Sequence, residues 1–523
     1  MTAAIQSEPT VLSRKIRLLG VGIAGVAELE NLVTAGLTVT DDRGSAQAQL
    51  AEAVPTVENR LWKLLPDGRM ETTWVIRRNA VWHDGTPVTP ADLLFTTQVA
   101  QDREIGAFRE SAYDMIDAVE SDGDRSLTVR WKQPFIEADS LFANERALPL
   151  PKHLLEKTYL EDKSNFTQVS YWNEGFVSTG PYRVSRWDPG TGVVLQAFDQ
   201  FALGRPKIDQ IDVRFIPNPT SLAAAILAGT VDLTIGRSLS LEQSLDVRDR
   251  WTDGKIDVGN ITSAIVVYPQ FIDPSPAIVG DVRFRRALLQ ALDRQEMADT
   301  FQAGLTPVAH AFVVPSHAEF PGVQDQIVRY PYDPRQATDA LGSLGYTRGA
   351  DGTFRDASGA PLGVEIRTSQ GDDLQEKSLF GMAGFWQRIG VNVAQVLVPP
   401  QQAQGREYRA TFPGFDVRRQ PGDRAFLERV HGSKTPLPEN DFVGNNYNRY
   451  MNPDFDALID RYFATIPVAD RTRVLGQIVH HMTDQVLYLT LFYQASPVMA
   501  ANRLRNVTAF NQGWNASAWE WAD

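Results

Sequence analysis

Hydrophobic and polar residues alternate along residues 72–77, which is the period-two pattern of a half-buried β-strand. An Asp-Gly pair at residues 84–85 then favours a tight turn, because glycine tolerates positive φ angles. Thr89 is a good N-cap for a helix that would begin with the proline after it, and Asp92 stands where a capping box places its acidic residue. The stretch from residue 72 to 96 therefore predicts a strand, a turn and a capped helix.

Two later segments, residues 208–236 and 363–399, each have the pattern of a strand, a helix and a second strand. This order favours parallel strands joined by a right-handed crossover. Between them, residues 281–293 place apolar side chains at the spacing of an amphipathic helix. The region that begins at residue 50 is rich in turn signals and predicts β structure instead. Together these patterns predict an α/β protein with two lobes and an additional β-rich part.

The length and composition restrict the class of protein. A chain of 523 residues is too long for one core, so two or three domains are expected. The net charge of −13 argues against a nucleic-acid-binding protein, which needs clustered lysine and arginine. Because the chain has no cysteine, disulfides, thiolate catalysis and cysteine-ligated metals are excluded. No run of about 18 apolar residues occurs, so the sequence predicts no membrane-spanning helix.

One motif favours a different class of protein. Residues 20–25 match the pattern G-x-G-x-x-G, and Asp41 and Asp42 follow at about the distance of a ribose-binding acid. The glycine motif and these aspartates would form the nucleotide site of an oxidoreductase, which we keep as the alternative function. The chain continues into turn-rich β structure and not into alternating strands and helices, which argues against an oxidoreductase. The seven histidines lack the spacing of a metal site, and no Walker loop or G-x-S-x-G motif occurs, so we predict no metal, no cofactor and no enzyme.

Six segments of the chain carry a further signal. The first is residues 50–96, which contain TTWVIRRNAVWHDGTPVTPADLLFT at residues 72–96. The others are residues 177–198, 206–233, 281–297, 447–460 and 487–507. In this order they resemble signatures of the family 5 extracellular solute-binding proteins, the capture subunits of bacterial peptide, nickel and related ABC importers. One such segment alone would be weak evidence, whereas six in the family's order are strong evidence.

The resemblance implies a bilobal α/β fold of the periplasmic-binding-protein type, in its large peptide-binding class (type II), with a β-rich subdomain inserted in the first lobe. The expected limits are residues 1–45, 177–268 and 488–523 for the first lobe, 46–176 for the inserted subdomain and 269–487 for the second lobe. The solute would bind between the lobes, and the ligand would select the closed state of a hinge motion.

The resemblance also implies a function. The protein would capture a small solute outside the membrane and deliver it to an ABC permease and its ATPase, as a monomer and without a cofactor. A short peptide is the default ligand, and an oligosaccharide, an opine-like conjugate or a chelated metal are the alternatives. The same fold also serves in chemosensing. We expect a periplasmic protein or a surface lipoprotein whose signal peptide is absent here, because the N-terminal residues lack the apolar core of a signal peptide.

The choice of ligand is expected to depend on residues 409–427. In peptide-binding relatives, an aspartate in the corresponding loop pairs with the peptide's α-ammonium, and Phe415-Asp416 is similar to that position. However, Asp416 precedes the next proline by five residues instead of four, and Arg418 and Arg419 replace the usual polar or acidic run. These arginines could instead bind a carboxylate or a phosphate.

Three further residues are predicted to contact the ligand. Trp172 lies in a loop before the STGPY segment and could stack on a ligand, and Gly22 and Ile23 belong to the expected cleft-lining loop of the first lobe. The other tryptophans that were considered for stacking are by type more often core residues: Trp82, Trp187, Trp386 and Trp514.

Overall fold

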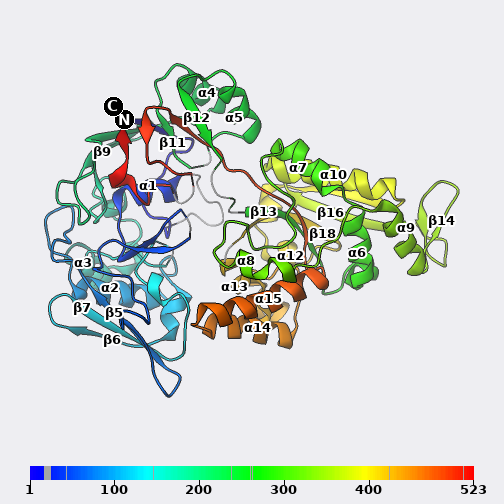
Figure 1. Ribbon diagram of the computed structural model, residues 1–523, viewed down its shortest axis with the longest axis horizontal. Helices are drawn as coiled ribbons and strands as arrows, with labels where there is room; N and C mark the ends of the chain where they lie inside the picture. The colour runs from blue at the N-terminus through cyan, green and yellow to red at the C-terminus, as the bar shows by residue number, and fades with distance from the viewer. Residues whose placement is uncertain are drawn as a thin grey trace. The chain divides into compact units, whose positions relative to one another are not determined.

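The computed structural model describes residues 1–16, 25–42, 44–144, 146–236, 238–258, 261, 263–422, 424–509 and 512–522, apart from the side chains at positions 111 and 425. The chain forms two compact units, one made of Met1–Asn260 and Ser496–Asp523, the other of Ile261–Ala495 (Figure 1). Gly22 and Ile23, two of the predicted ligand contacts, lie outside the described residues, as does most of the glycine motif.

The main sheet of the first unit contains seven strands, in the order β12 (Gly254–Asp257), β20 (Val498–Ala501), β11 (Leu233–Thr234), β1 (Thr2–Ile5), β10 (Gln210–Phe215), β9 (Gly192–Ala197) and β8 (Tyr182–Asp188). The helix α4 (Pro219–Leu227) follows β10 and leads to β11. Both strands are parallel to β1, which lies between them. The predicted strand–helix–strand unit is therefore present, but the N-terminal strand separates its two strands.

The C-terminal segment completes this sheet. Strand β20 is antiparallel to both β11 and β12, so residues that follow the second unit return to the first. The first unit also contains α1 (Val26–Val33), α5 (Leu241–Arg248) and the strand pairs β2 (Thr38–Thr40) with β3 (Ala46–Ala48) and β21 (Leu504–Arg505) with β22 (Glu520–Trp521).

A second, antiparallel sheet of the first unit has the order β4 (Trp62–Leu64), β5 (Met70–Val75), β7 (Ser126–Trp131) and β6 (Ile116–Asp122), accompanied by α2 (Pro90–Gln101) and α3 (Lys152–Glu161). The predicted strand and capped helix are β5 and α2. The Asp92 carboxylate accepts the backbone N–H of Thr89 at 2.9 Å and that of Lys152 at 3.0 Å, so it ties the starts of both helices together. This sheet lies within residues 46–176, although the limits of an inserted subdomain stay a prediction.

The second unit is built on a five-stranded sheet with the order β17 (Asn392–Val398), β16 (Gly363–Ser369), β18 (Phe415–Pro421), β13 (Ser263–Pro269) and β19 (Leu489–Tyr493). Strand β16 is parallel to β17 and β18, whereas β13 is antiparallel to β18 and β19. The predicted limits of the second lobe, residues 269 and 487, would leave β13 and β19 outside it. Both strands pair within this sheet, so the second unit extends from Ile261 to Ala495.

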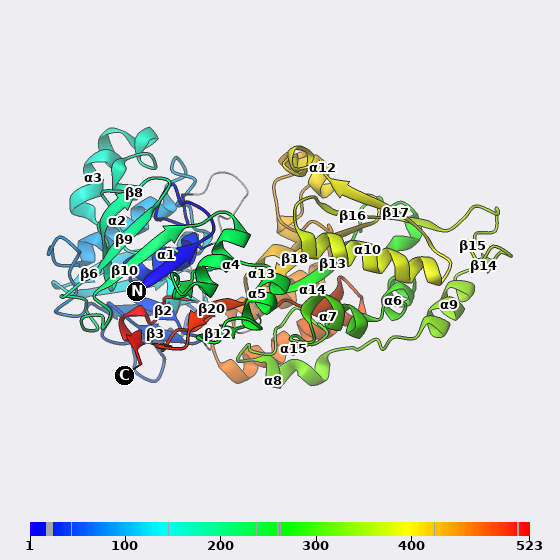
Figure 2. The same cartoon turned by 90° about the horizontal axis from the view of Figure 1, so that it is seen from above.

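Helix α10 (Asp373–Arg388) joins β16 to β17 and packs on the sheet, as Figure 2 shows. This strand–helix–strand unit agrees with the pattern of residues 363–399. The other elements of the unit are α6 (Val282–Gln290), α7 (Arg294–Gln302), α8 (Phe320–Val323), α9 (Pro334–Ser343), α11 (Pro400–Ala403), α12 (Arg406–Ala410), α13 (Arg424–Val430), α14 (Pro453–Ala464), α15 (Val468–Asp484) and the hairpin β14 (Thr347–Arg348) with β15 (Phe354–Arg355).

Replacing Gly180 with alanine is expected to destabilise the first unit by about 1–3 kcal/mol, because a side chain there overpacks the core. An added Cβ would lie 2.3 Å from the backbone N of Thr34 and 2.3 Å from the carbonyl C of Val33. Urea unfolding followed by circular dichroism measures the loss. The matched control is Gly106→Ala, where an added Cβ meets nothing within 4 Å. Equal stability of the two variants would contradict the close approach at Gly180.

Candidate functional site

The second unit contains a polar cavity at the carboxyl ends of its parallel strands. The cavity has about 250 Å³ of free space and is lined by Arg367, Ser369, Gln375, Val398, Ala403, Tyr408, Arg409, Asp416, Arg418, Arg419 and Gln420. Open α/β sheets bind ligands at this edge of the sheet. The volume is slightly below the roughly 300–1,000 Å³ of small-molecule pockets, so this cavity alone suits part of a small solute.

Three of the predicted ligand contacts line this cavity, and the first of them is Asp416. Its side chain is almost completely buried, with 5% exposed. The Arg418 guanidinium donates two hydrogen bonds to Asp416 Oδ2, at 3.0 Å from Nε and 2.6 Å from Nη2. Nε of Arg367 lies 3.5 Å from the same oxygen. Two arginines of the protein itself therefore already surround this carboxylate, whose place in the sequence is similar to that of the amine-binding aspartate of peptide-binding relatives.

Aromatic rings hold these guanidinium groups in place. Arg367 lies over Tyr408 and Phe412, at 5.0 and 4.8 Å from the ring centroids. Arg418 lies over Tyr447 at 4.2 Å. Cation–π contacts of this kind stabilise a guanidinium that has lost its water. Burial lowers the pKa of Arg367. Burial also acts to lower the pKa of Arg418, but the charge of Asp416, its hydrogen bond and the nearby tyrosines together raise this pKa above its usual value.

Arg419, the third predicted residue at the cavity, has its own acidic partner. Its Nη1 lies 2.8 Å from Asp372 Oδ2, and its Nε donates to Gln494 Oε1. The side chain of Asp372 also caps α10 by accepting the backbone N–H of Gln375 at 3.2 Å. Arg419 therefore links β18 to the start of α10 at the border of the cavity.

Phe415 lies in the core and not in the cavity. Its side chain is 0% exposed, and its ring centroid is 5.1 Å from that of Trp386. Successive residues of a strand point to opposite faces, so the neighbour of a cavity residue on β18 faces the core. The prediction that Phe415 contacts the ligand is therefore not supported by its position.

Trp172 is a core residue of the first unit. Its side chain is 2% exposed, its Nε1 donates to the carbonyl oxygen of Phe166 at 2.6 Å, and its ring packs against Phe108 with centroids 5.1 Å apart. Its N–H is satisfied by the protein. Its ring lines a small cavity of the first unit together with Phe108, and the free space there, about 30 Å³, suits water and not a solute.

Sequence reasoning missed the cavity residues Arg367 and Arg409, and also Tyr447, whose ring contacts Arg409 and Arg418. Arg367 lies on β16 and pairs directly with Asp416 across the parallel β16–β18 register. The alternation along residues 363–369 was available from the sequence, but the register that places these two residues side by side was not. Arg409 and Tyr447 come from α12 and a loop, where no periodic pattern marks them.

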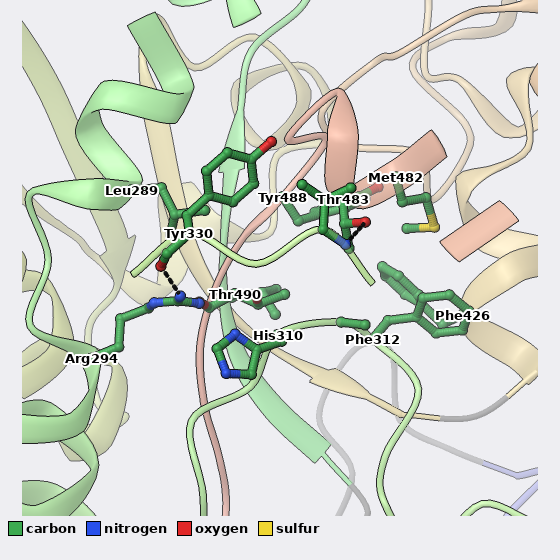
Figure 3. Close-up of a pocket in the computed structure, with 13 residues that line it drawn as sticks. Leu289, Arg294, His310, Phe312, Tyr330, Phe426, Met482, Thr483, Tyr488 and Thr490 are labelled. Atoms are coloured by element: carbon green, nitrogen blue, oxygen red, sulfur yellow. Dashed lines mark hydrogen bonds between the residues drawn. The ribbon is translucent and has the colours of Figure 1, made fainter. Parts of the chain in front are cut away.

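A second cavity of the same unit, drawn in Figure 3, surrounds the buried side chain of Arg294. Its guanidinium donates to the carbonyl oxygens of Ala309 and Thr490, both at 3.0 Å, and of Tyr330 at 2.8 Å. Burial lowers the pKa of Arg294 to about 10 and that of the neighbouring His310 to about 4. The free space of about 20 Å³ suits a single water molecule, so this polar centre supports the loops around it and does not hold a solute.

The described ranges contain no group of three or more His, Asp or Glu side chains that could hold a metal ion. Within the same part of the chain, none of the helices has the length and apolar character needed to cross a membrane.

A comparison with protein families decides what kind of protein contains this cavity. Residues 52–436 match the model described as bacterial extracellular solute-binding proteins, family 5 Middle. The chain belongs to this family. The family expected from the six sequence segments is therefore confirmed, as is the bilobal α/β binding-protein fold. Family 5 consists of solute-binding proteins, which leaves the oxidoreductase alternative without support.

Curated relatives are similar over most of the chain. The oligopeptide-binding protein AppA of Bacillus subtilis (strain 168) is 22% identical over 477 residues, which are 89% of this chain and 81% of AppA. The nickel-binding periplasmic protein of Escherichia coli (strain K12) is 22% identical over 451 residues, which are 85% of this chain and 82% of that protein.

Solved structures share the fold. AppA from Bacillus subtilis in complex with a nonapeptide superimposes with a TM-score of 0.74 at 20% identity, over 100% of this chain and 99% of AppA. NikA from Brucella suis in complex with Fe(III)-EDTA superimposes with a TM-score of 0.79 at 17% identity, over 100% of both chains.

Proposed function

We propose that this protein is the solute-binding subunit of an ABC importer and that its solute is a short peptide. The observation that carries the proposal is the cavity at the carboxyl edge of β16, β17 and β18, in a chain whose family consists of solute-binding proteins. The cavity presents charged and amide groups that can orient a ligand, and binding requires no chemical change of the solute. A peptide is proposed as the solute because AppA, which is similar over 89% of this chain, is an oligopeptide-binding protein.

The proposed partners and location follow from this role. The protein acts as a monomer outside the cytoplasmic membrane, in the periplasm or as a surface lipoprotein. It delivers its solute to a membrane permease that is driven by an ATPase. Reduced uptake of the solute in cells that lack the gene would support this role, whereas unchanged uptake with a lost chemotactic response would indicate sensing instead.

A metal chelate is the second candidate for the solute. Related structures contain such ligands: NikZ from Campylobacter jejuni contains Ni(L-His), and NikA from Brucella suis contains Fe(III)-EDTA. The described residues of this chain offer no cluster of metal ligands, so the metal would arrive already coordinated. Arginines of the cavity could then hold the carboxylates of the chelator.

Native mass spectrometry of the purified protein is expected to detect a retained solute whose mass identifies a peptide or a chelate. Added ligand should then stabilise the folded protein by about 2.7 kcal/mol at a hundredfold excess over its dissociation constant, which thermal unfolding measures. A protein that retains no solute and is not stabilised by peptides, chelates or sugars would contradict the proposal. Stabilisation by NAD or FAD instead would favour the oxidoreductase alternative.

A further inference from the structure

The cavity of the second unit has more positive than negative charge. Arg367, Arg409 and Arg418 lie on one side of β18 around a single cavity carboxylate, that of Asp416. The charge of Glu365 on β16 also acts on Arg367, but Glu365 forms no ion pair among the described residues, and burial raises its pKa. Even with Glu365 counted as ionised, three guanidinium groups face two carboxylates.

These three arginines form one cluster, which the backbone of Arg409 connects. The carbonyl oxygen of Arg409 accepts hydrogen bonds from Nη2 of Arg367 at 3.1 Å and from Nη2 of Arg418 at 3.3 Å. Arg409 and Arg418 also share the ring of Tyr447, at 5.4 and 4.2 Å from its centroid. Their charges are therefore close together and largely shielded from water.

Arg409 is the member of the cluster without an acidic partner. Within the described part of the chain its guanidinium forms no ion pair, and its Nε is buried without a hydrogen-bond acceptor. Nε of Arg367 likewise forms no hydrogen bond, although it lies 3.5 Å from Asp416 Oδ2. A buried donor without a partner costs about 1–3 kcal/mol, and a buried unpaired charge costs more. The cluster therefore lacks one anion.

We propose that the cavity binds its solute through a carboxylate, which lies against Arg409 and Arg418 and supplies the missing negative charge. Asp416 is then the counter-ion that positions Arg418 and Arg367, and it does not bind an amine. A guanidinium presents planar paired donors that match a carboxylate, which makes such a contact selective. This inference rests on the proposed function and names the chemical group by which the solute is recognised.

The test uses citrate as a carboxylate probe, inorganic phosphate as a tetrahedral anion and spermidine as a cationic probe. Isothermal titration calorimetry at constant ionic strength is expected to show saturable citrate binding that is tighter than phosphate binding, and no spermidine binding. Arg409→Gln is expected to weaken citrate binding at least tenfold, which corresponds to about 1.4 kcal/mol. Arg409→Lys should restore it only in part, because the ammonium lacks the planar fork.

The matched control is Arg473→Gln, which removes an exposed arginine of α15 that pairs with Asp470 and should leave citrate binding unchanged. Asp416→Asn separates the two roles of Asp416. If Asp416 is a counter-ion, the variant binds citrate as tightly as the wild type or more tightly. If Asp416 anchors an amine, the wild type binds spermidine and the variant does not. Thermal unfolding of each variant without ligand checks that it folds.

Citrate binding that is equal in wild type and Arg409→Gln would overturn the inference, as would no citrate binding, tighter binding of phosphate, or spermidine binding that requires Asp416. These failures differ from failure of the proposed function. A protein that retains a neutral or cationic solute in native mass spectrometry remains a solute-binding subunit, although it is not selective for carboxylates.

Discussion

Replacing Arg471 with methionine is expected to destabilise the second unit by about 3–5 kcal/mol, because it leaves a buried carboxylate without its main partner. Arg471 Nε donates to Oε1 of Glu319 at 2.7 Å, and the Tyr462 hydroxyl donates to Oε2 at 2.8 Å. The Glu319 side chain is only 3% exposed. Since α15, α14 and the segment before α8 contribute one residue each, the loss should affect all three.

The same network predicts how this loss depends on pH. Burial alone would raise the pKa of Glu319, but the charges of Arg424 and Arg471 and the hydrogen bonds from Arg471 and Tyr462 together hold it below the ordinary value of 4.5. The ionised carboxylate therefore stabilises the folded wild type above about pH 4.5, and this contribution is lost as the pH falls through the lower folded pKa. In Arg471→Met, protonation of Glu319 removes the unpaired charge. The difference between variant and wild type should thus be larger at pH 7 than at pH 4.

Urea unfolding of both proteins at the two pH values measures this difference. Arg473→Met is the matched control, because Arg473 lies on the same helix with its side chain 73% exposed and pairs only with Asp470 among its described neighbours. An exposed pair of this kind contributes about 0–1 kcal/mol. If the two variants were equally stable, or if the loss at Arg471 did not change with pH, the buried network would not have the assigned role.

The fold could be predicted from the sequence where local patterns agree with the final structure. The cap at Thr89 and the strand–helix–strand pattern of residues 363–399 are local signals, and both are present as predicted. The sequence did not indicate that β13 and β19 belong to one sheet, because more than 200 residues separate these neighbouring strands in the chain. Periodicity identifies a strand, but it does not identify the strand's partners.

The candidate site was predictable only along a single strand. Asp416 and Arg418 are two residues apart on β18 and therefore face the same side, so two residues that were predicted from one short segment share the cavity. Phe415 was predicted from the same segment, but its side chain lies on the opposite face of the strand. Arg367 and Arg409 join the cluster through a parallel register and a backbone carbonyl, which are tertiary features without a local signal.

Replacing Trp386 with alanine is expected to cost about 3–5 kcal/mol, because it leaves a large cavity beneath the sheet of the second unit. The side chain is 0% exposed, its Nε1 donates to the carbonyl oxygen of Leu288 at 3.0 Å, and its ring packs on Phe415. Trp386→Phe should cost less, since much of the ring volume remains. Circular dichroism in urea measures both variants without relying on tryptophan fluorescence.

A role of Trp386 in ligand stacking would give the opposite result. The matched control is Phe380→Ala on the same helix, where the aromatic side chain is 47% exposed and its loss should change stability by no more than about 0.5 kcal/mol. If Trp386→Ala were as stable as the wild type but lost its affinity for solute, Trp386 would be a ligand contact. Because the ring fills the space between α10 and β18, we expect its loss to weaken solute binding only indirectly, by loosening the strand that carries Asp416 and Arg418.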